Sequence, residues 1–109
     1  MHVITRRHLK EAGDQYRDAA KEIEVWYKIV KKANWRNFVE VRQTFTDADD
    51  VDGYVVFNIR RNDYRLITII HYCREIEGRV TEGRVYIRSF LTHKEYDSRN
   101  NWDKGLKKQ

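Results

Sequence analysis

The residues best suited to chemistry follow one another near the end of the chain. Thr92 and Glu95 have the spacing of a capping box, which predicts a short helix with Thr92 as its N-cap. Residues three apart lie on one face of a helix, so His93 and Tyr96 would project together. An imidazole and a phenol beside the ammonium group of Lys94, at the start of a helix, are suited to proton transfer at a phosphate.

Two of these side chains also have a plainer interpretation. Tyr96 would occupy the fourth helical position, where it could pack against Leu91 as a hydrophobic staple. His93 could be an ordinary exposed histidine. From the sequence alone, both the reactive and the structural interpretation stay open.

Arginines near a predicted turn could hold the phosphate. Arg65 begins a strand shortly after the turn, where an antiparallel neighbour would bring it close to the end of the last strand. It is a candidate phosphate clamp, or the partner of Asp63 or Glu95 in an ion pair. Arg60 and Arg61, in the turn itself, are candidates for contacts with an RNA backbone.

Side chains alternate along a strand, so one face of the final predicted strand would be cationic and aromatic. That face comprises Arg84, Tyr86, Arg88 and Phe90. Arginine forks bind phosphates and aromatic rings stack on bases, which suits single-stranded RNA or DNA. A solvated face, with arginine stems covering the rings, is the alternative.

No metal or cofactor is expected. His71 and Cys73 would share one side of a strand, but two ligands do not make a zinc site. The acidic segment 47–52 lacks the ligand pattern of an EF-hand. The chain also has no P-loop, dinucleotide-binding fingerprint or nucleophile elbow.

Composition favours one soluble domain with a polyanionic partner. The 109 residues carry a net charge of +5, and all of the excess lies in residues 57–109, with twelve basic and seven acidic side chains. No apolar run approaches the roughly 18 residues of a membrane span. Because residues 1–20 also lack a signal-peptide pattern, we expect a cytoplasmic protein without a membrane partner.

The hydropathy pattern predicts helices first and strands second. The helices are expected after Thr5, over 16–33 and from 38 to 45, and the strands over 2–4, 54–60, 64–74 and 84–91. Segment 47–52 is expected to be a loop and segment 75–83 a loose turn. This order indicates an α+β domain over residues 1–97, with the helices on one face of a small, mainly antiparallel sheet. Residues 98–109 are expected to be a flexible basic tail.

Three blocks of this sequence, in order, resemble the HigB-type toxins of bacterial toxin–antitoxin systems, within the RelE/ParE group. The blocks are VWYKIVKKANWRNF (25–38), VVFNIRRNDYRLI (55–67) and VYIRSFLTHKEYD (85–97). The resemblance implies a RelE-like fold and a ribosome-dependent endoribonuclease that cuts mRNA in the decoding site. It also implies a helix-turn-helix antitoxin of the HigA type as partner.

The resemblance carries over to particular positions. Arg65 corresponds to an active-site arginine of RelE-type toxins, and the block that begins at Thr92 corresponds to further basic residues and a tyrosine, here His93, Lys94 and Tyr96. We hypothesise metal-independent cleavage by the substrate's 2′-hydroxyl, with charge stabilised by these cations and by Arg88. One departure is the acidic segment 47–52, where such toxins often supply lysines.

Two other functions remain open from the sequence. One is a ParE-like inhibitor that acts on a topoisomerase by contact, and the other is a non-catalytic RNA-binding module. A titrating pair such as His93 and Tyr96 favours an enzyme, because binding alone requires no proton transfer. Lys31, Lys32 and Arg36 are the candidates for docking to ribosomal RNA.

Overall fold

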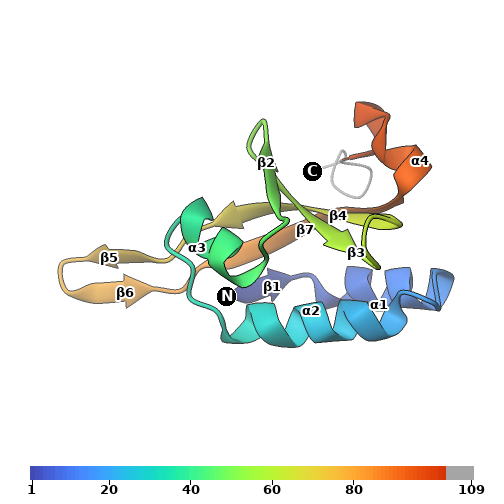
Figure 1. The fold of residues 1–109 in the computed structure, drawn as a ribbon. Coiled ribbons are helices and arrows are strands. Elements are labelled where there is room, and N and C mark those ends of the chain that lie inside the picture. Colours follow the sequence, from blue (N-terminus) through green and yellow to red (C-terminus); the bar gives the residue numbers. More distant parts are fainter. Residues whose placement is uncertain (103–109) are drawn as a thin grey trace.

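A computed structural model of the chain describes residues 1–102. Figure 1 shows two antiparallel helices, α1 (Arg6–Gln15) and α2 (Ala20–Lys32), packed together on one face of a sheet, with the short α3 (Phe38–Thr44) beside them. The predicted α+β class, with N-terminal helices on one sheet face, is confirmed. Within the described residues, no helix is long and apolar enough to cross a membrane.

The helices form where the apolar period predicted them. On α2 the buried residues are Ile23, Trp26 and Val30, which the 3.6-residue period places on one stripe. The helix begins at Ala20 rather than at the predicted Tyr16, because residues 16–19 form the turn from α1. This turn lets the two helices pack as an antiparallel pair against the sheet.

The main sheet has five strands in the order β1-β7-β4-β3-β2. The strands are β1 (His2–Ile4), β2 (Asp49–Val51), β3 (Tyr54–Ile59), β4 (Tyr64–His71) and β7 (Arg84–Thr92). β1 runs parallel to β7, and the other neighbours are antiparallel. The predicted central meander and opening strand are therefore correct, and β4 lies at the middle of the sheet.

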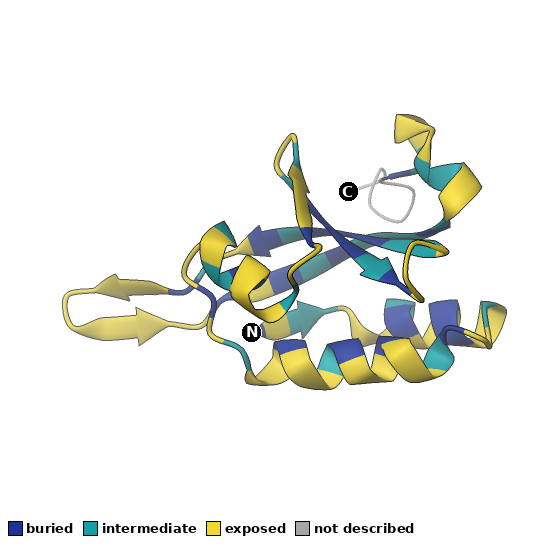
Figure 2. Ribbon diagram, viewed as in Figure 1, coloured by how far each residue is buried: buried dark blue, intermediate teal, exposed yellow. Residues whose placement is uncertain are grey.

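Two expected irregular segments are ordered hairpins instead. Segment 47–52 contains β2, which turns into β3 through Asp52 and Gly53, with φ values of 51° and 87°. Segment 75–83 carries most of a second hairpin, β5 (Arg74–Ile76) with β6 (Arg79–Thr81), which extends away from the sheet in Figures 1 and 2. Positive φ at both central residues of a two-residue turn matches the right-handed twist of the strands.

An irregularity in the β4–β7 ladder changes which residues share a face. Ile67 pairs with Ser89 while Thr68 pairs with Ile87, so Arg88 is an extra residue on β7. The alternation is interrupted there. Phe90 consequently turns to the helix side and packs against aromatic rings, so its predicted placement on one face with Arg84, Tyr86 and Arg88 is wrong.

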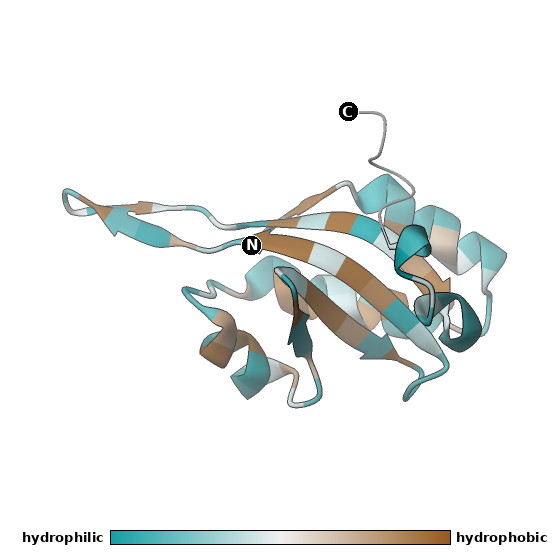
Figure 3. Cartoon of the chain, turned by 90° about the horizontal axis from the view of Figure 1, so that it is seen from above, coloured by the Kyte–Doolittle hydropathy of each residue, from teal (hydrophilic) through white to brown (hydrophobic). Residues whose placement is uncertain are grey.

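Apolar residues of the central strands, brown in Figure 3, belong to clusters on both faces of the sheet. The larger cluster lies under the helices and includes Trp26, Trp35 and Phe57. The smaller one lies on the opposite face and consists of Val56, Ile67, Leu91 and Trp102, with half-buried neighbours. The second cluster means that this face is partly occupied by the C-terminal part of the chain.

The first residues of the predicted tail are therefore not a tail. Arg99–Asn101 form a 3-10 turn, η1, and Trp102 is 3% exposed. The hydroxyl of Ser89 donates to the carbonyl oxygens of Asn101 and Trp102, at 2.9 and 2.8 Å. A large apolar surface and these bonds hold the segment on β7. The rest of the predicted tail, 103–109, lies outside the described residues.

Two valines on α3 give a matched test of this core. Val41 is fully buried, whereas Val39 is 65% exposed. Because deleting two buried methyl groups removes transfer energy and leaves a cavity, we expect Val41→Ala to lower the free energy of unfolding by about 2 kcal/mol. Val39→Ala should change it by less than about 0.5 kcal/mol in the same urea titration. Equal losses would contradict the burial pattern.

Candidate active site

The sheet face opposite α1 and α2 ends at a short helix, α4 (His93–Tyr96), whose start is fixed as the sequence predicted. The backbone N–H of Thr92 donates to the carboxylate of Glu95 at 3.0 Å, and the N–H of Glu95 donates to the Thr92 hydroxyl at 3.2 Å. This is the predicted capping box. It turns the chain sharply off β7 and directs the following residues back over the sheet.

Arg65 lies on β4 opposite Leu91 of β7, so its predicted approach to the end of the last strand is confirmed. Its Nη1 donates to the carbonyl oxygen of Asn62 at 2.6 Å, which anchors the guanidinium without neutralising its charge. The guanidinium carbon lies 5.0 Å from the centroid of the Tyr96 ring, within the range of a cation–π contact. Two side chains from β4 and α4 thus meet.

Tyr96 packs as its structural interpretation predicted, and it also lines a polar pocket. It packs on the cluster that contains Leu91, and its ring stacks on Trp102 with centroids 4.8 Å apart and planes at 16°. The indole N–H of Trp102 donates to the carbonyl oxygen of Tyr96 at 2.9 Å. Tyr96 also borders a pocket beside Arg65, so packing fixes the ring without hiding it.

That pocket, of about 360 Å³, is where the site residues gather. Its lining comes from five elements or their connections and consists of Arg42, Asp47, Ala48, Asp49, Val56, Asn58, Arg65 and Tyr96. Sequence reasoning found only the last two. Asn58 pairs directly with Arg65 across β3 and β4, and its amide donates to Asp47 at 3.1 Å. Side chains alternate along β3, so Asn58 lies on the same face as Val56. With the correct β3–β4 register, the sequence would have predicted that Asn58 lies beside Arg65.

The electrostatics of the pocket favour a neutral phenol. Burial is the largest cause that raises the pKa of Tyr96, and the carboxylate of Asp49 raises it further. The guanidinium groups of Arg65 and Arg99 act in the opposite direction, but the net shift is upward. The phenol of Tyr96 is therefore harder to deprotonate than that of an ordinary tyrosine.

The C-terminal turn reinforces this corner, which the sequence did not predict. The guanidinium carbon of Arg99 lies 4.4 Å from the Trp102 ring centroid, and Arg99 forms a 3.0 Å ion pair with Asp52 in the β2–β3 turn. The Tyr54 ring meets Trp102 edge to face at 5.4 Å. These contacts connect α4 and η1 to the opposite wall of the site.

His93 and Lys94 lie on the exposed first turn of α4 and do not line the pocket. The backbone N–H of His93 donates to the carbonyl of Asp63 at 2.9 Å, next to the carbonyl of Asn62 that holds Arg65. One turn therefore anchors both the guanidinium and the start of α4. Of the four predicted catalytic residues, Arg65 and Tyr96 come together, while His93 and Lys94 lie outside the pocket lining, on the exposed turn of α4.

The predicted RNA-binding arginines of the β3–β4 turn are divided. Arg60 points toward the helices, where its guanidinium pairs with Asp18 at 2.6 Å and its backbone N–H bonds to Glu22. Arg61 is exposed and has a φ of 62°. Arg60 thus fastens the turn to the α1–α2 pair, on the side away from the pocket.

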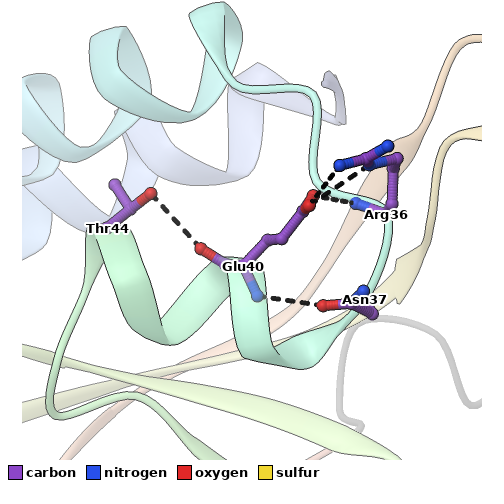
Figure 4. A network of polar contacts seen from close by, with 4 residues as sticks. All are labelled: Arg36, Asn37, Glu40 and Thr44. Carbon is purple, nitrogen blue, oxygen red and sulfur yellow. Dashed lines mark hydrogen bonds and ion pairs between the residues drawn. The ribbon is translucent and has the colours of Figure 1, made fainter.

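The candidates for docking lie at the end of α2 and just beyond it. Lys31 and Lys32 are exposed, and the Lys31 ammonium lies 5.9 Å from the Tyr27 ring centroid. Figure 4 shows Arg36 bonded through its side chain and backbone to Glu40, with a shortest side-chain distance of 2.9 Å. The hydrogen bond from Arg36 lowers the pKa of Glu40, so this pair persists as an ion pair at neutral pH.

His71 and Cys73, which were considered as metal ligands from the sequence, differ in burial. Cys73 is buried, with its sulfur 3.8 Å from that of Met1, whereas His71 is exposed and meets the Tyr86 ring edge to face at 5.0 Å. Across residues 1–102, no three His, Cys, Asp or Glu side chains gather as metal ligands would.

A sheet with a helical pair on one face and, on the other, a pocket in which Arg65 meets Tyr96 is the arrangement that the resemblance to RelE-like toxins implies. The chain belongs to the HigB toxin family. The model of this family, described as the RelE-like toxic component of a toxin-antitoxin system, matches residues 19–99 and thus includes the whole of the pocket lining. The resemblance found in the sequence is confirmed.

Curated relatives agree with this membership. The mRNA interferase toxin HigB of Escherichia coli K12 is 27% identical over 100 residues, which cover 89% of this chain and 88% of the relative. The mRNA interferase HigB of Shigella flexneri matches to the same extent. The mRNA interferase HigB of Escherichia coli O6:H1 strain CFT073 is 22% identical over 100 residues, covering 89% of each chain.

The charge of Asp49 gives a direct test of the pocket's electrostatics. Because this carboxylate opposes ionisation of the phenol, Asp49→Asn should lower the pKa of Tyr96 toward the ordinary value. The measurement is a pH titration of the tyrosine ¹³Cζ shift in labelled protein, with Tyr96→Phe to assign the signal. Asp50→Asn, the adjacent change, is the control. A Tyr96 pKa that is equal in parent and Asp49→Asn would contradict the arrangement.

Proposed function

We propose that this chain is the toxin of a toxin–antitoxin pair and an endoribonuclease that cuts mRNA in the ribosomal decoding site. The observation that carries the proposal is the meeting of Arg65 and Tyr96 in one pocket on the open side of the sheet. Family membership and the printed names of the relatives, mRNA interferases, support the same reaction.

The proposed reaction is an internal transfer at phosphorus that uses the protein's own side chains. The 2′-oxygen of the substrate forms a bond to phosphorus as its proton passes to a base. The bond from phosphorus to the 5′-oxygen breaks, and that oxygen receives a proton from an acid. The products are a 2′,3′-cyclic phosphate and a free 5′-hydroxyl, so no water is consumed in this step.

We propose acid and base roles that the sequence left open. Tyr96, a phenol that is protonated at neutral pH and lies beside Arg65, is proposed as the acid for the leaving oxygen. His93, whose backbone is anchored to the same turn as Arg65, is proposed as the base. Arg65 neutralises charge on phosphorus, assisted by the exposed Lys94 of α4. Arg88 lines two other hollows and not this pocket. We therefore propose Arg42, which does line the pocket, in place of Arg88 as the further cation that stabilises charge.

The small number of proposed catalytic groups in this site would explain a dependence on the ribosome. An enzyme with a clamp, an acid and an exposed base gains from a substrate held for in-line attack by another body, which is a proximity effect. The net charge of +5 and the exposed Lys31 and Lys32 would favour ribosomal RNA. Translated mRNA as substrate implies action in the cytoplasm, with inhibition by a helix-turn-helix antitoxin of the HigA type.

Removing the clamp or the acid tests the proposal. We expect Arg65→Ala to slow cleavage by about 10²–10³-fold, because it removes one charge-stabilising contact. Tyr96→Phe should slow it by about 10²–10⁴-fold, because it removes only the proton donor. The rate is measured by mapping mRNA ends after single-turnover incubation with programmed ribosomes.

Arg79→Ala, on the exposed β6, and Tyr72→Phe are the matched controls, and both should cut at the parental rate. Thermal unfolding establishes that each variant is folded. Intact mRNA with the parent protein, together with trapped DNA breaks in cells, would instead favour the topoisomerase inhibitor. Parental cleavage by both site variants would refute the assignment.

The base has a separate test. We expect His93→Ala to slow ribosomal cleavage by about 10²–10⁴-fold, because the 2′-proton loses its acceptor. Lys94→Ala should cost less, since this ammonium is one of several cations. If His93→Ala cuts like the parent while Tyr96→Phe does not, the acceptor is another group, and Asp49 in the pocket lining becomes the candidate.

A further inference from the structure

A second cationic hollow lies on another part of the sheet, where β1 ends, α1 begins and β7 continues as an edge. It has a volume of about 420 Å³, within the range of ligand pockets. Its ionisable lining residues, apart from Tyr86, are Arg7, His8, His71 and Arg88. None of the lining residues is a carboxylate, and the first turn of α1 contains no acidic residue.

Acidic neighbours lie outside this hollow. Glu11, one turn further along α1, and Glu95 line the adjoining hollow, which shares His8 and Arg88 with it. Among the described lining residues of the two hollows, the carboxylates thus lie in the adjoining one, and the arginines and histidines lie in this one. A concave site with excess positive charge concentrates an anionic ligand, because its walls focus the field.

An aromatic pair completes the hollow. His71 at the end of β4 and Tyr86 on β7 meet edge to face, with centroids 5.0 Å apart and planes at 64°. His71 is exposed and Tyr86 is half-buried, so neither ring is enclosed by the core. Rings beside arginines are the combination by which proteins hold unpaired bases together with their phosphates.

The bulge in β7 explains why Arg88 borders this hollow. Because Arg88 is the extra residue of β7, it leaves the regular alternation and borders the hollow at the strand edge. His71 follows Arg65 by six residues on the same face of β4, a separation of about 20 Å at the rise of a strand. The hollow is thus distinct from the pocket of Arg65 and Tyr96.

We propose that this hollow is a second RNA site, which binds one unpaired nucleotide outside the cleavage pocket. Arg7 and Arg88 bind the phosphate, and the His71–Tyr86 pair receives the base. The proposal rests on the proposed function only in taking RNA as the ligand. RNA is favoured over an acidic protein segment because the rings, which a carboxylate does not need, line the same hollow as the cations.

Binding without cleavage tests this site. The probe is a fluorescein-labelled single-stranded RNA of ten nucleotides, within the roughly 4–16 nucleotides of single-strand sites, followed by anisotropy in the absence of ribosomes. We expect Arg7→Glu to raise Kd by at least about 10-fold and His71→Ala to raise it by about 5-fold or more. Arg7→Ala should reduce the salt slope of binding by about one.

Lys10→Glu is the matched control, because it makes the same charge change on α1 at an exposed residue that does not line this hollow. It should change Kd by less than about 3-fold. Arg7 and His71 are exposed, and circular dichroism melting verifies that their variants fold. Every variant in this assay keeps the residues of the cleavage pocket, and binding is measured without cleavage, so failure of the cleavage proposal and failure of this one are distinguishable.

Three results would overturn the proposal. One is an equal loss of affinity in Arg7→Glu and Lys10→Glu, which indicates a diffuse charge effect. The second is a duplex RNA that binds as tightly as the single strand and is insensitive to His71→Ala. The third is a ten-residue polyglutamate that displaces the RNA and binds equally to parent and His71→Ala, which would identify the hollow as a surface for an acidic protein.

Discussion

The pairing of β4 with β7 is the constraint on which the site depends. It places Arg65 opposite Leu91 and Tyr64 opposite Thr92, so the last residue of β7 lies beside the turn that anchors the arginine. The capping box at Thr92 then sets the direction in which the chain leaves the sheet. Tyr96 returns over the sheet because of that direction. A shift of one residue in this ladder would turn Arg65 into the helix-side core and separate the two side chains.

The sheet divides two tasks between its faces. On one face the helices bury most of the apolar surface, and this larger core supplies most of the stability expected from burial. On the other, a small cluster around Trp102 fixes the Tyr96 ring from behind, while the pocket beside it stays open to a polar ligand. The aromatic stack therefore restrains the Tyr96 ring while leaving it in the pocket lining, which is how a small domain can preorganise a side chain without enclosing it.

Sequence reasoning succeeded where the signal was local. The capping box, the α2 stripe and the strand composition each follow from residues close together in the chain, and so α4, α2 and the meander were predicted. The pocket lining was missed because it depends on register. A three-residue link would pair Arg60 with Tyr64, whereas the link has four residues and Ile59 takes that place, which brings Asn58 opposite Arg65. The Asp52-Gly53 pair was an available hairpin signal for β2 that the acidic composition obscured.

The position of β1 has a consequence for how the toxin comes into being. This strand includes the second residue of the chain and pairs with Arg84 at the start of β7, so the sheet closes only across more than eighty residues. Arg65 likewise lacks its contact with Tyr96 until Tyr96 has been synthesised. A nascent chain that has not yet exposed β7 and α4 therefore contains no complete site. The pocket of Arg65 and Tyr96 therefore assembles only after α4 has been synthesised.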